Sequence, residues 1–255
     1  MALHEKNAYL NKDINYLINE EIIEYDMKSA GYNLSRHFKL LPPHVLAKLE
    51  GMEKKQRQME LGWIQKRDKA FAKDLSAAFA EGRKLFYEAN DLSEDNILSI
   101  KKDAIFVTKR CEHLAFGEHL VFQPKNEYTS YYYMGGIEFY YHSTLDQLDV
   151  KGLGDEGEDL HADFMLGFLM SMFYRNETST DTQKNIKFLL SFADHYRNRR
   201  LECGYYRELN RASMYKLQRT LQGELVGVGH IDSPKLLDIH YNYMNFVVPL
   251  ISVYL

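Results

Sequence analysis

Apolar and polar residues alternate over Glu21–Lys28, the pattern of a β-strand with one buried face. Ile23, Tyr25 and Met27 share one face, so Asp26 points from the other. An acid therefore occupies a position where a sheet buried on both faces would place an apolar residue.

The same periodicities predict further elements along the chain. A helix is expected over Ala30–Leu40, Pro42-Pro43 ends it, and two or three helices follow over His44–Ala89. Short strands are expected at Ile97–Lys109, His119–Gln123, Tyr128–Met134, Ile137–His142 and Asp146–Lys151, the third and fourth joined by a tight turn at Gly135-Gly136. Later helices are expected at Leu160–Tyr174, Thr182–Arg200 and Tyr205–Leu221. This order predicts an α+β fold in which helices flank a mainly antiparallel sheet.

A second acid, Asp103, lies in the strand-like segment Ile97–Val107. Two carboxylates on neighbouring strands can hold two divalent cations, so Asp26 and Asp103 form a candidate metal site. The alternative is structural: Asp26 ends a strand at a polar edge, and Asp103 belongs to a Lys-Lys-Asp turn.

Four short segments resemble motifs of family B DNA polymerases and follow the order of that family. Asp26–Tyr32 (Asp-Met-Lys-Ser-Ala-Gly-Tyr) resembles the first catalytic motif, and Ser99–Val107 (Ser-Ile-Lys-Lys-Asp-Ala-Ile-Phe-Val) resembles the second. Lys125–Tyr128 resembles the later Lys-x-Tyr motif, and Val150–Leu153 resembles the Lys-Gly that follows it. The resemblance implies a reduced, phage-encoded polymerase palm without an exonuclease and with degenerate fingers.

The resemblance also implies a nucleotidyltransferase that adds nucleotides to a 3'-hydroxyl by a two-metal mechanism. Asp26 and Asp103 would be catalytic and would share two Mg2+ or Mn2+ ions, with the backbone carbonyl of Met27 as a further ligand.

Contacts to the nucleoside triphosphate are expected from Tyr32 and from three lysines of the charged helical stretch. Tyr32 would correspond to the family's tyrosine beneath the incoming sugar, although Gly31 occupies the place where the family usually has it. The alternative is that Tyr32 is a half-buried helix aromatic. Lys66, Lys69 and Lys73 are the candidates for the triphosphate, and they could equally form a solvated face.

Contacts to the nucleic acid are expected from the later motifs. Lys125 and Tyr128 would touch the primer end, and Lys151 would touch the duplex backbone. The alternative for Lys125 and Tyr128 is an ordinary strand end. Tyr131–Tyr133 is typical of a packed sheet, although it could also stack unpaired bases.

The sequence differs from the family B polymerase motifs in two places. Lys101 and Lys102 replace the first Asp and the Thr of the usual Asp-Thr-Asp, and the fingers motif is not visible. We expect a palm-like region over residues 1–155 with a helical, fingers-like insertion at about 42–90. A helical, thumb-like region with a C-terminal tail is expected over residues 156–255.

Composition and charge fit a globular protein with a nucleic-acid partner. The 255 residues are 45% apolar and 27% charged, with a net charge of -4. Ten Lys or Arg stand against six acids over Lys48–Lys84 and nine against four over Asp181–Arg219, whereas Glu138–Asp163 carries eight acids and one Lys. Two basic arms around an acidic centre suit a nucleic-acid cleft, and the alternative is that helices carry charged outer faces.

Two widely spaced cysteines and the lack of a long apolar segment lead us to expect a cytoplasmic protein with no membrane association, in the host cytoplasm if viral. Two functions remain open. One is a small nucleotidyltransferase that uses a primer, a template and nucleoside triphosphates. The other is an inactive, polymerase-derived module that binds nucleic acid or other replication proteins.

Overall fold

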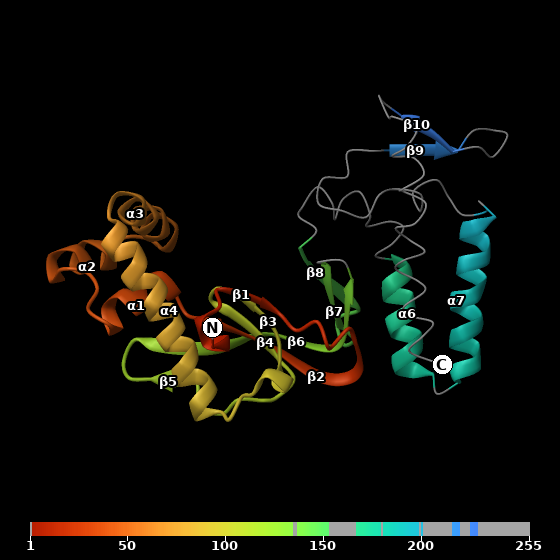
Figure 1. The fold of residues 1–255 in the computed structure, drawn as a ribbon, viewed down its shortest axis with the longest axis horizontal. Coiled ribbons are helices and arrows are strands. Elements are labelled where there is room, and N and C mark those ends of the chain that lie inside the picture. The colour runs from red at the N-terminus through yellow and green to blue at the C-terminus, as the bar shows by residue number, and fades with distance from the viewer. Residues whose placement is uncertain are drawn as a thin grey trace. The chain divides into compact units, whose positions relative to one another are not determined.

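The computed structural model describes residues 2–134, 137–152, 167–179, 181–198, 200, 216–219 and 225–228. The helices are α1 Ala30–His37, α2 Pro43–Glu50, α3 Lys54–Arg67, α4 Lys69–Ala89, α6 Gly167–Thr178 and α7 Thr182–Arg197, with short 3-10 helices η1 Leu3–Glu5 and η2 Glu94–Asn96. The strands are β1 Ala8–Leu10, β2 Tyr16–Met27, β3 Ile97–Lys101, β4 Ala104–Val107, β5 Ala115–Phe116, β6 Leu120–Met134, β7 Ile137–His142, β8 Gln147–Lys151, β9 Lys216–Arg219 and β10 Leu225–Val228. This content confirms the α+β class predicted from the sequence (Figure 1).

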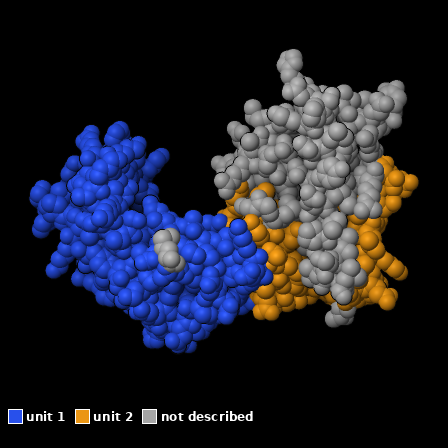
Figure 2. Space-filling view, viewed as in Figure 1, with its two compact units in different colours: residues 1–14, 21–127 blue, residues 15–20, 128–255 orange. Residues whose placement is uncertain are grey.

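The chain divides into two compact units (Figure 2). Unit 1 comprises residues 1–14 and 21–127, and unit 2 comprises residues 15–20 and 128–255. The expected boundary between palm-like and thumb-like regions, near residue 155, is a division by function and stays a prediction.

In unit 1 the strands follow the order β1-β3-β4-β2-β6, and β1 with β3, β3 with β4 and β4 with β2 pair antiparallel. Strand β2 is therefore central, with β4 on one side and β6 on the other. The segment that carries Asp26 is thus a direct neighbour of the segment that follows Asp103.

The apolar face predicted for β2 is buried, although Ile22 and Glu24 on its other face are buried as well. Ile23, Tyr25 and Met27 are each at most 1% exposed and belong to the main core cluster of unit 1. Helix α4 packs against this face, with the ring centroids of Tyr25 and Phe86 5.3 Å apart. Because the apolar face is buried under α4, the carboxylate of Asp26 must leave from the opposite face of the sheet.

The single strand predicted over Ile97–Lys109 is wrong, because the chain turns back at Lys102 and Asp103 to form the β3-β4 hairpin. Lys102 makes this turn with a positive φ of 61°. A left-handed backbone costs a non-glycine residue about 1–2 kcal/mol, so neighbouring groups must hold it. The amide of Lys102 donates to the carbonyl oxygen of Asn7 at 2.7 Å, and Arg83 Nη1 donates to the carbonyl oxygen of Lys102, also at 2.7 Å.

Arg83 is a fully buried cation of α4 that ties the hairpin to the N-terminal segment. Its Nε donates to the carbonyl oxygen of His4 at 2.8 Å, and its Nη2 donates to Asn7 Oδ1 at 3.0 Å. Burial lowers the pKa of the Arg83 guanidinium. These bonds anchor the β3-β4 turn to helix α4.

Two strands are longer than predicted. Strand β2 begins at Tyr16 rather than Glu21, and β6 runs from Leu120 to Met134 through Pro124, which merges two predicted strands. The strands predicted over Ile137–His142 and Asp146–Lys151 are confirmed as β7 and β8.

Unit 2 contains the antiparallel pairs β6-β7 and β7-β8 and an aromatic core. Tyr131, Tyr132, Tyr140 and Tyr141 are each at most 2% exposed, and the Tyr141 ring stacks on Phe173 of α6 with centroids 5.4 Å apart. These tyrosines pack the sheet, so they are not available to stack unpaired bases.

The C-terminal predictions have mixed outcomes. The helix predicted from Thr182 is confirmed as α7, and α6 begins at Gly167. The helix predicted over Tyr205–Leu221 is wrong at residues 216–219, where β9 pairs antiparallel with β10. Leu, Gln and Arg favour helices individually, but pairing with a second strand overrides that weak preference. The turn at Gly135-Gly136 and residues 160–166, 205–215 and 220–221 lie outside the described residues.

Within the described part of the chain, every helix is too short or too polar to traverse a lipid bilayer.

Candidate functional site

The β2-β4 pairing brings the two predicted acids to one place in unit 1. Asp26 of β2 lies opposite Ala104 of β4, and Asp103 immediately precedes Ala104 in the hairpin turn. The amide of Met27 donates to the carbonyl oxygen of Asp103 at 3.0 Å, which fixes the turn against the end of β2. Residues 77 positions apart in sequence are therefore held side by side.

The electrostatic environment of Asp26 is unfavourable for a second negative charge. Burial, followed by the nearby charge of Asp103, raises the pKa of the Asp26 carboxyl group; Lys125 and Lys54 act in the opposite direction without cancelling the effect. The described residues provide neither a hydrogen bond nor an ion pair to the carboxylates of Asp26 and Asp103. Paired acids without a compensating donor are a typical environment for a bound cation.

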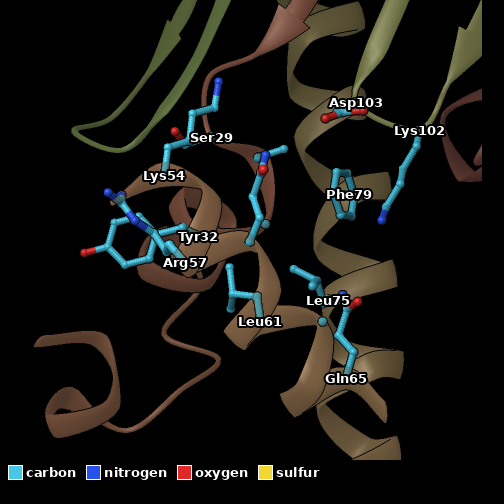
Figure 3. A pocket seen from close by; sticks show the side chains of 14 residues that line it. Ser29, Tyr32, Lys54, Arg57, Leu61, Gln65, Leu75, Phe79, Lys102 and Asp103 are labelled. Atoms are coloured by element: carbon cyan, nitrogen blue, oxygen red, sulfur yellow. The ribbon is translucent and has the colours of Figure 1, made fainter. Parts of the chain in front are cut away.

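A cavity of about 230 Å³ opens beside Asp103 (Figure 3). It lies between the start of α1, helix α3, helix α4 and the hairpin turn. Its lining consists of Ser29, Ala30, Gly31, Tyr32, Lys54, Arg57, Gln58, Leu61, Gly62, Gln65, Leu75, Phe79, Lys102 and Asp103. The cavity therefore joins one of the two acids to a wall that carries cations.

The cations of this wall differ from those predicted. Lys54 and Arg57, one helical turn apart on α3, line the cavity together with Lys102. Lys102 holds its Nζ 5.1 Å from the centre of the Phe79 ring. Two cations of α3 and one of the hairpin turn are thus the basic groups that line this cavity.

The three lysines predicted to bind the triphosphate lie elsewhere on the helices. Lys66 is near the end of α3, and Lys69 and Lys73 are in the first turns of α4; all three are exposed, and none lines the cavity. Their role in nucleotide binding stays a prediction.

Tyr32 and Arg57 form a stacked pair at the cavity wall. The Arg57 guanidinium lies over the Tyr32 ring, with Cζ 4.5 Å from the centroid, and Arg57 Nη2 donates to the carbonyl oxygen of Met52 at 3.1 Å. Tyr32 is 4% exposed, so it is a buried rather than half-buried aromatic. Neither the Tyr32 hydroxyl nor Arg57 Nε has a hydrogen-bond partner among the described residues. Buried polar atoms normally find partners, so these two atoms mark polar groups available to a ligand or water.

Lys125 lies on β6, next to β2, and its charge is engaged. Its Nζ is 3.0 Å from Glu24 Oε1, and Asn126 Nδ2 donates to Glu24 Oε2 at 2.7 Å. Glu24 is 2% exposed and comes two residues before Asp26 on the same face of β2. Lys125 therefore lies on the same face of the sheet as Asp26.

Tyr128 and Lys151 belong to unit 2, where both contact Asp149. The Tyr128 hydroxyl donates to Asp149 Oδ2 at 2.6 Å, and Lys151 Nζ is 3.6 Å from the same oxygen. Their expected contacts to primer and duplex stay predictions.

Sequence reasoning missed the contribution of Arg57, although a signal for it exists. Arg57, Leu61 and Ile64 follow i, i+4, i+7 spacing along α3, and this stripe is the more buried side of the helix. A cation on the apolar stripe of a helix indicates a site that needs charge. The break between α3 and α4 at Asp68 hid this stripe, because the whole stretch resembled continuous charged helix.

Within the described residues, no three His, Cys, Asp or Glu side chains form a group that could hold a metal ion. The acid pair consequently supplies two carboxylates, and any further ligands would come from backbone, water or substrate.

Comparison with known proteins gives the family of the chain. The family described as Bacteriophage PBS1 gene 130 protein matches residues 1–255. No curated protein matches the chain. The full-length match confirms the expected phage origin, and the chain belongs to the bacteriophage PBS1 gene 130 protein family.

Proposed function

We propose that the protein is a small metal-dependent nucleotidyltransferase that resembles the palm of a family B DNA polymerase and adds nucleotides to a 3'-hydroxyl. One observation carries the proposal: Asp26 at the end of β2 and Asp103 in the adjacent β3-β4 turn, from segments that resemble the two catalytic motifs, lie close enough for the charge of Asp103 to raise the pKa of Asp26. The strand order supports it further, because β2 has the hairpin with Asp103 on one side and the strand with Lys125 on the other.

The donor set fits Mg2+ or Mn2+. Carboxylate oxygens suit these ions, and Mg2+ usually keeps several waters, so two protein carboxylates and the Met27 carbonyl are a sufficient set. Two such ions, when bound, supply activation of the 3'-hydroxyl and stabilisation of charge on the leaving phosphates. The chain itself contributes the position of the acids, which β2 and the anchored hairpin impose.

The cavity beside Asp103 is the proposed site for the nucleoside triphosphate. Lys54 and Arg57 place two positive charges on its wall. Guanidinium groups bind phosphate oxygens through paired hydrogen bonds, and ammonium groups act as point charges. Tyr32, stacked under Arg57, would be the platform beneath the sugar.

The primer and template complete the proposed substrate. Lys125 would bind a primer phosphate once its bond to Glu24 is exchanged, with Tyr128 and Lys151 as further nucleic-acid contacts from unit 2. Other replication proteins are proposed partners of the same assembly.

A primer-extension assay with labelled nucleotide and Mg2+ or Mn2+ tests this function. Wild type should extend the primer, and Asp26→Asn and Asp103→Asn should each lose more than about 100-fold in rate, because loss of a direct ligand exceeds the 10- to 100-fold effect of outer-shell changes. Asp74→Asn, which removes an exposed carboxylate of α4, is the matched control and should extend normally. Equal rates for wild type and both site variants would refute the proposal.

A second function is supported by the residues around Asp103. Lys101 and Lys102 stand where the family has an Asp and a Thr, and the described residues offer two rather than three clustered acids. These features favour an inactive module that binds nucleic acid or a replication protein. Absence of extension by wild type, together with duplex binding that Asp26→Asn leaves unchanged, would establish this alternative.

A further inference from the structure

Helix α3 carries two different faces, and one of them has no role in the fold or the cavity. Arg57, Leu61 and Gln65 line the cavity on one side. The other side is formed by six exposed residues, Lys55, Gln56, Met59, Trp63, Lys66 and Arg67, which we call the Trp63 face. Spacing of 3.6 residues per turn places these six on one surface of the helix.

The Trp63 face is unusual because it exposes large apolar side chains one turn apart. Met59 is 59% exposed and Trp63 is 52% exposed. Burying such side chains stabilises a protein by about 1.5–3 kcal/mol each, so their exposure in tandem is a feature of interaction surfaces.

The charges of this face select the partner. Lys55, Lys66 and Arg67 are all positive, and the described residues provide no ion-pair partner for them. Lys66 Nζ and Arg67 Cζ lie 5.3 Å and 5.6 Å from the Trp63 ring centroid. The nearest acid of the helix, Glu60, is bound to Lys48 of α2 at 2.9 Å. An aromatic platform with flanking free cations and no free acid matches a base and its neighbouring phosphates.

We propose that the Trp63 face binds single-stranded DNA by stacking a base on Trp63 and placing phosphates on Lys55, Lys66 and Arg67. The choice of DNA rests on the proposed function, whereas the binding itself needs neither the acid pair nor a nucleotide. Base stacking on an aromatic side chain tolerates any sequence, so this surface would hold a strand without reading it.

Trp63 is the single tryptophan of the chain, so its intrinsic fluorescence reports directly on this site. Titration of wild type with an unlabelled oligodeoxythymidylate, in EDTA and without nucleotide, should quench that fluorescence. Quenching should saturate at the same oligonucleotide concentration that saturates the anisotropy of a labelled strand. Binding detected by anisotropy with unchanged tryptophan fluorescence would place the strand elsewhere and overturn the proposal.

Variants then separate stacking from charge. Trp63→Ala should weaken binding about 5- to 100-fold, and Trp63→Phe should restore most of the affinity. Lys66→Ala/Arg67→Ala should reduce the slope of log affinity against log salt by about 1.4, since each lost phosphate contact on a single strand contributes about 0.7. Lys84→Ala/Lys184→Ala removes two charges elsewhere and should change neither quantity. Equal weakening by both double variants would indicate general charge attraction and refute the assignment.

Further measurements distinguish DNA binding by the Trp63 face from the proposed nucleotidyltransferase activity. Asp26→Asn should bind the single strand as wild type does, even where it abolishes primer extension. Tighter binding to an RNA strand of the same sequence would overturn the assignment to DNA. No binding by wild type that extends primers normally would refute the Trp63 face alone.

Discussion

The acid pair predicts an inverse relation between stability and metal binding that Asp26→Asn will reveal. Ionised Asp26 is destabilised by burial and by Asp103, which is why its pKa is raised. Asn has nearly the same shape and no charge, so the substitution removes both penalties. In the absence of divalent metal the variant should therefore be more stable than wild type.

The magnitude follows from the strand geometry. Asp26 lies opposite Ala104, the neighbour of Asp103, and the charge of Asp103 contributes to the raised pKa of Asp26. For two unit charges roughly 5–7 Å apart, Coulomb's law gives about 0.6–3 kcal/mol for effective dielectric constants between 80 and 20. Half-burial of Asp26 places the expected gain at about 1–2 kcal/mol, or a rise in Tm of roughly 3–6 °C. The gain should shrink as the pH falls toward about 4, the ordinary pKa of an unfolded Asp, because below that pH the carboxyl group of wild type is protonated in both the folded and the unfolded state.

Thermal unfolding in EDTA and in a Mg2+ or Mn2+ series measures both effects. Metal at ten times its Kd should raise the free energy of unfolding of wild type by about 1.4 kcal/mol and leave that of Asp26→Asn unchanged. Added metal should therefore reduce or reverse the stability advantage of the variant over wild type. Asp74→Asn should follow wild type throughout. A variant less stable than wild type in EDTA, or an equal metal response in both proteins, would refute the reasoning.

Three other predictions concern the scaffold. Arg83→Met should lower the free energy of unfolding by about 3–5 kcal/mol in chemical denaturation, because three partly buried acceptors lose the buried guanidinium that donates to them; retention of wild-type stability would contradict the anchoring role of Arg83. In a Cys203→Ser background, Cys111 should resist a thiol reagent at pH 8 until the protein unfolds, because burial raises the pKa of its thiol to about 11; rapid labelling of folded protein would disprove this. Gly82→Leu should destabilise by about 1–3 kcal/mol in the same denaturation assay, since even a Cβ at this position of α4 would lie 3.3 Å from Leu34 Cδ2, and an unchanged midpoint would show that the contact can relax.

The β-strands illustrate what the sequence can and cannot predict. Alternation at Ile23, Tyr25 and Met27 was sufficient to predict the end of β2 and its face toward the core, because burial of one face is a local signal. The β3-β4 hairpin was anticipated only by the alternative that Asp103 belongs to a Lys-Lys-Asp turn, which the structure confirms; the strand pattern missed it, since the turn contains no Gly, Pro or Asn. Lys102 adopts its positive φ because Asn7 and Arg83 hold its backbone, and these partners are distant in sequence.

The residues of the candidate site also differ in whether a local sequence pattern could predict them. The acids came from local motifs, and the structure places them together. The cavity cations Lys54 and Arg57 depend on how α3 is oriented against α1 and α4, which no local pattern specifies. Propensity and charge pattern alone therefore did not identify the cations that line this cavity.

Several features of the site lower the stability of the folded protein, and this cost bears on the choice between the two proposed functions. Like charges meet at Asp26 and Asp103, Lys102 adopts a left-handed backbone, and buried Arg83 is desolvated to hold the turn. Each of these conflicts with local stability, and such conflicts concentrate where function requires them. A module that had lost catalysis would gain stability by replacing either acid with Asn, and nothing in its binding role would oppose that change. The presence of Asp26 at the end of β2 beside Asp103 in an anchored turn is therefore an argument for metal binding, independent of the resemblance to polymerase motifs.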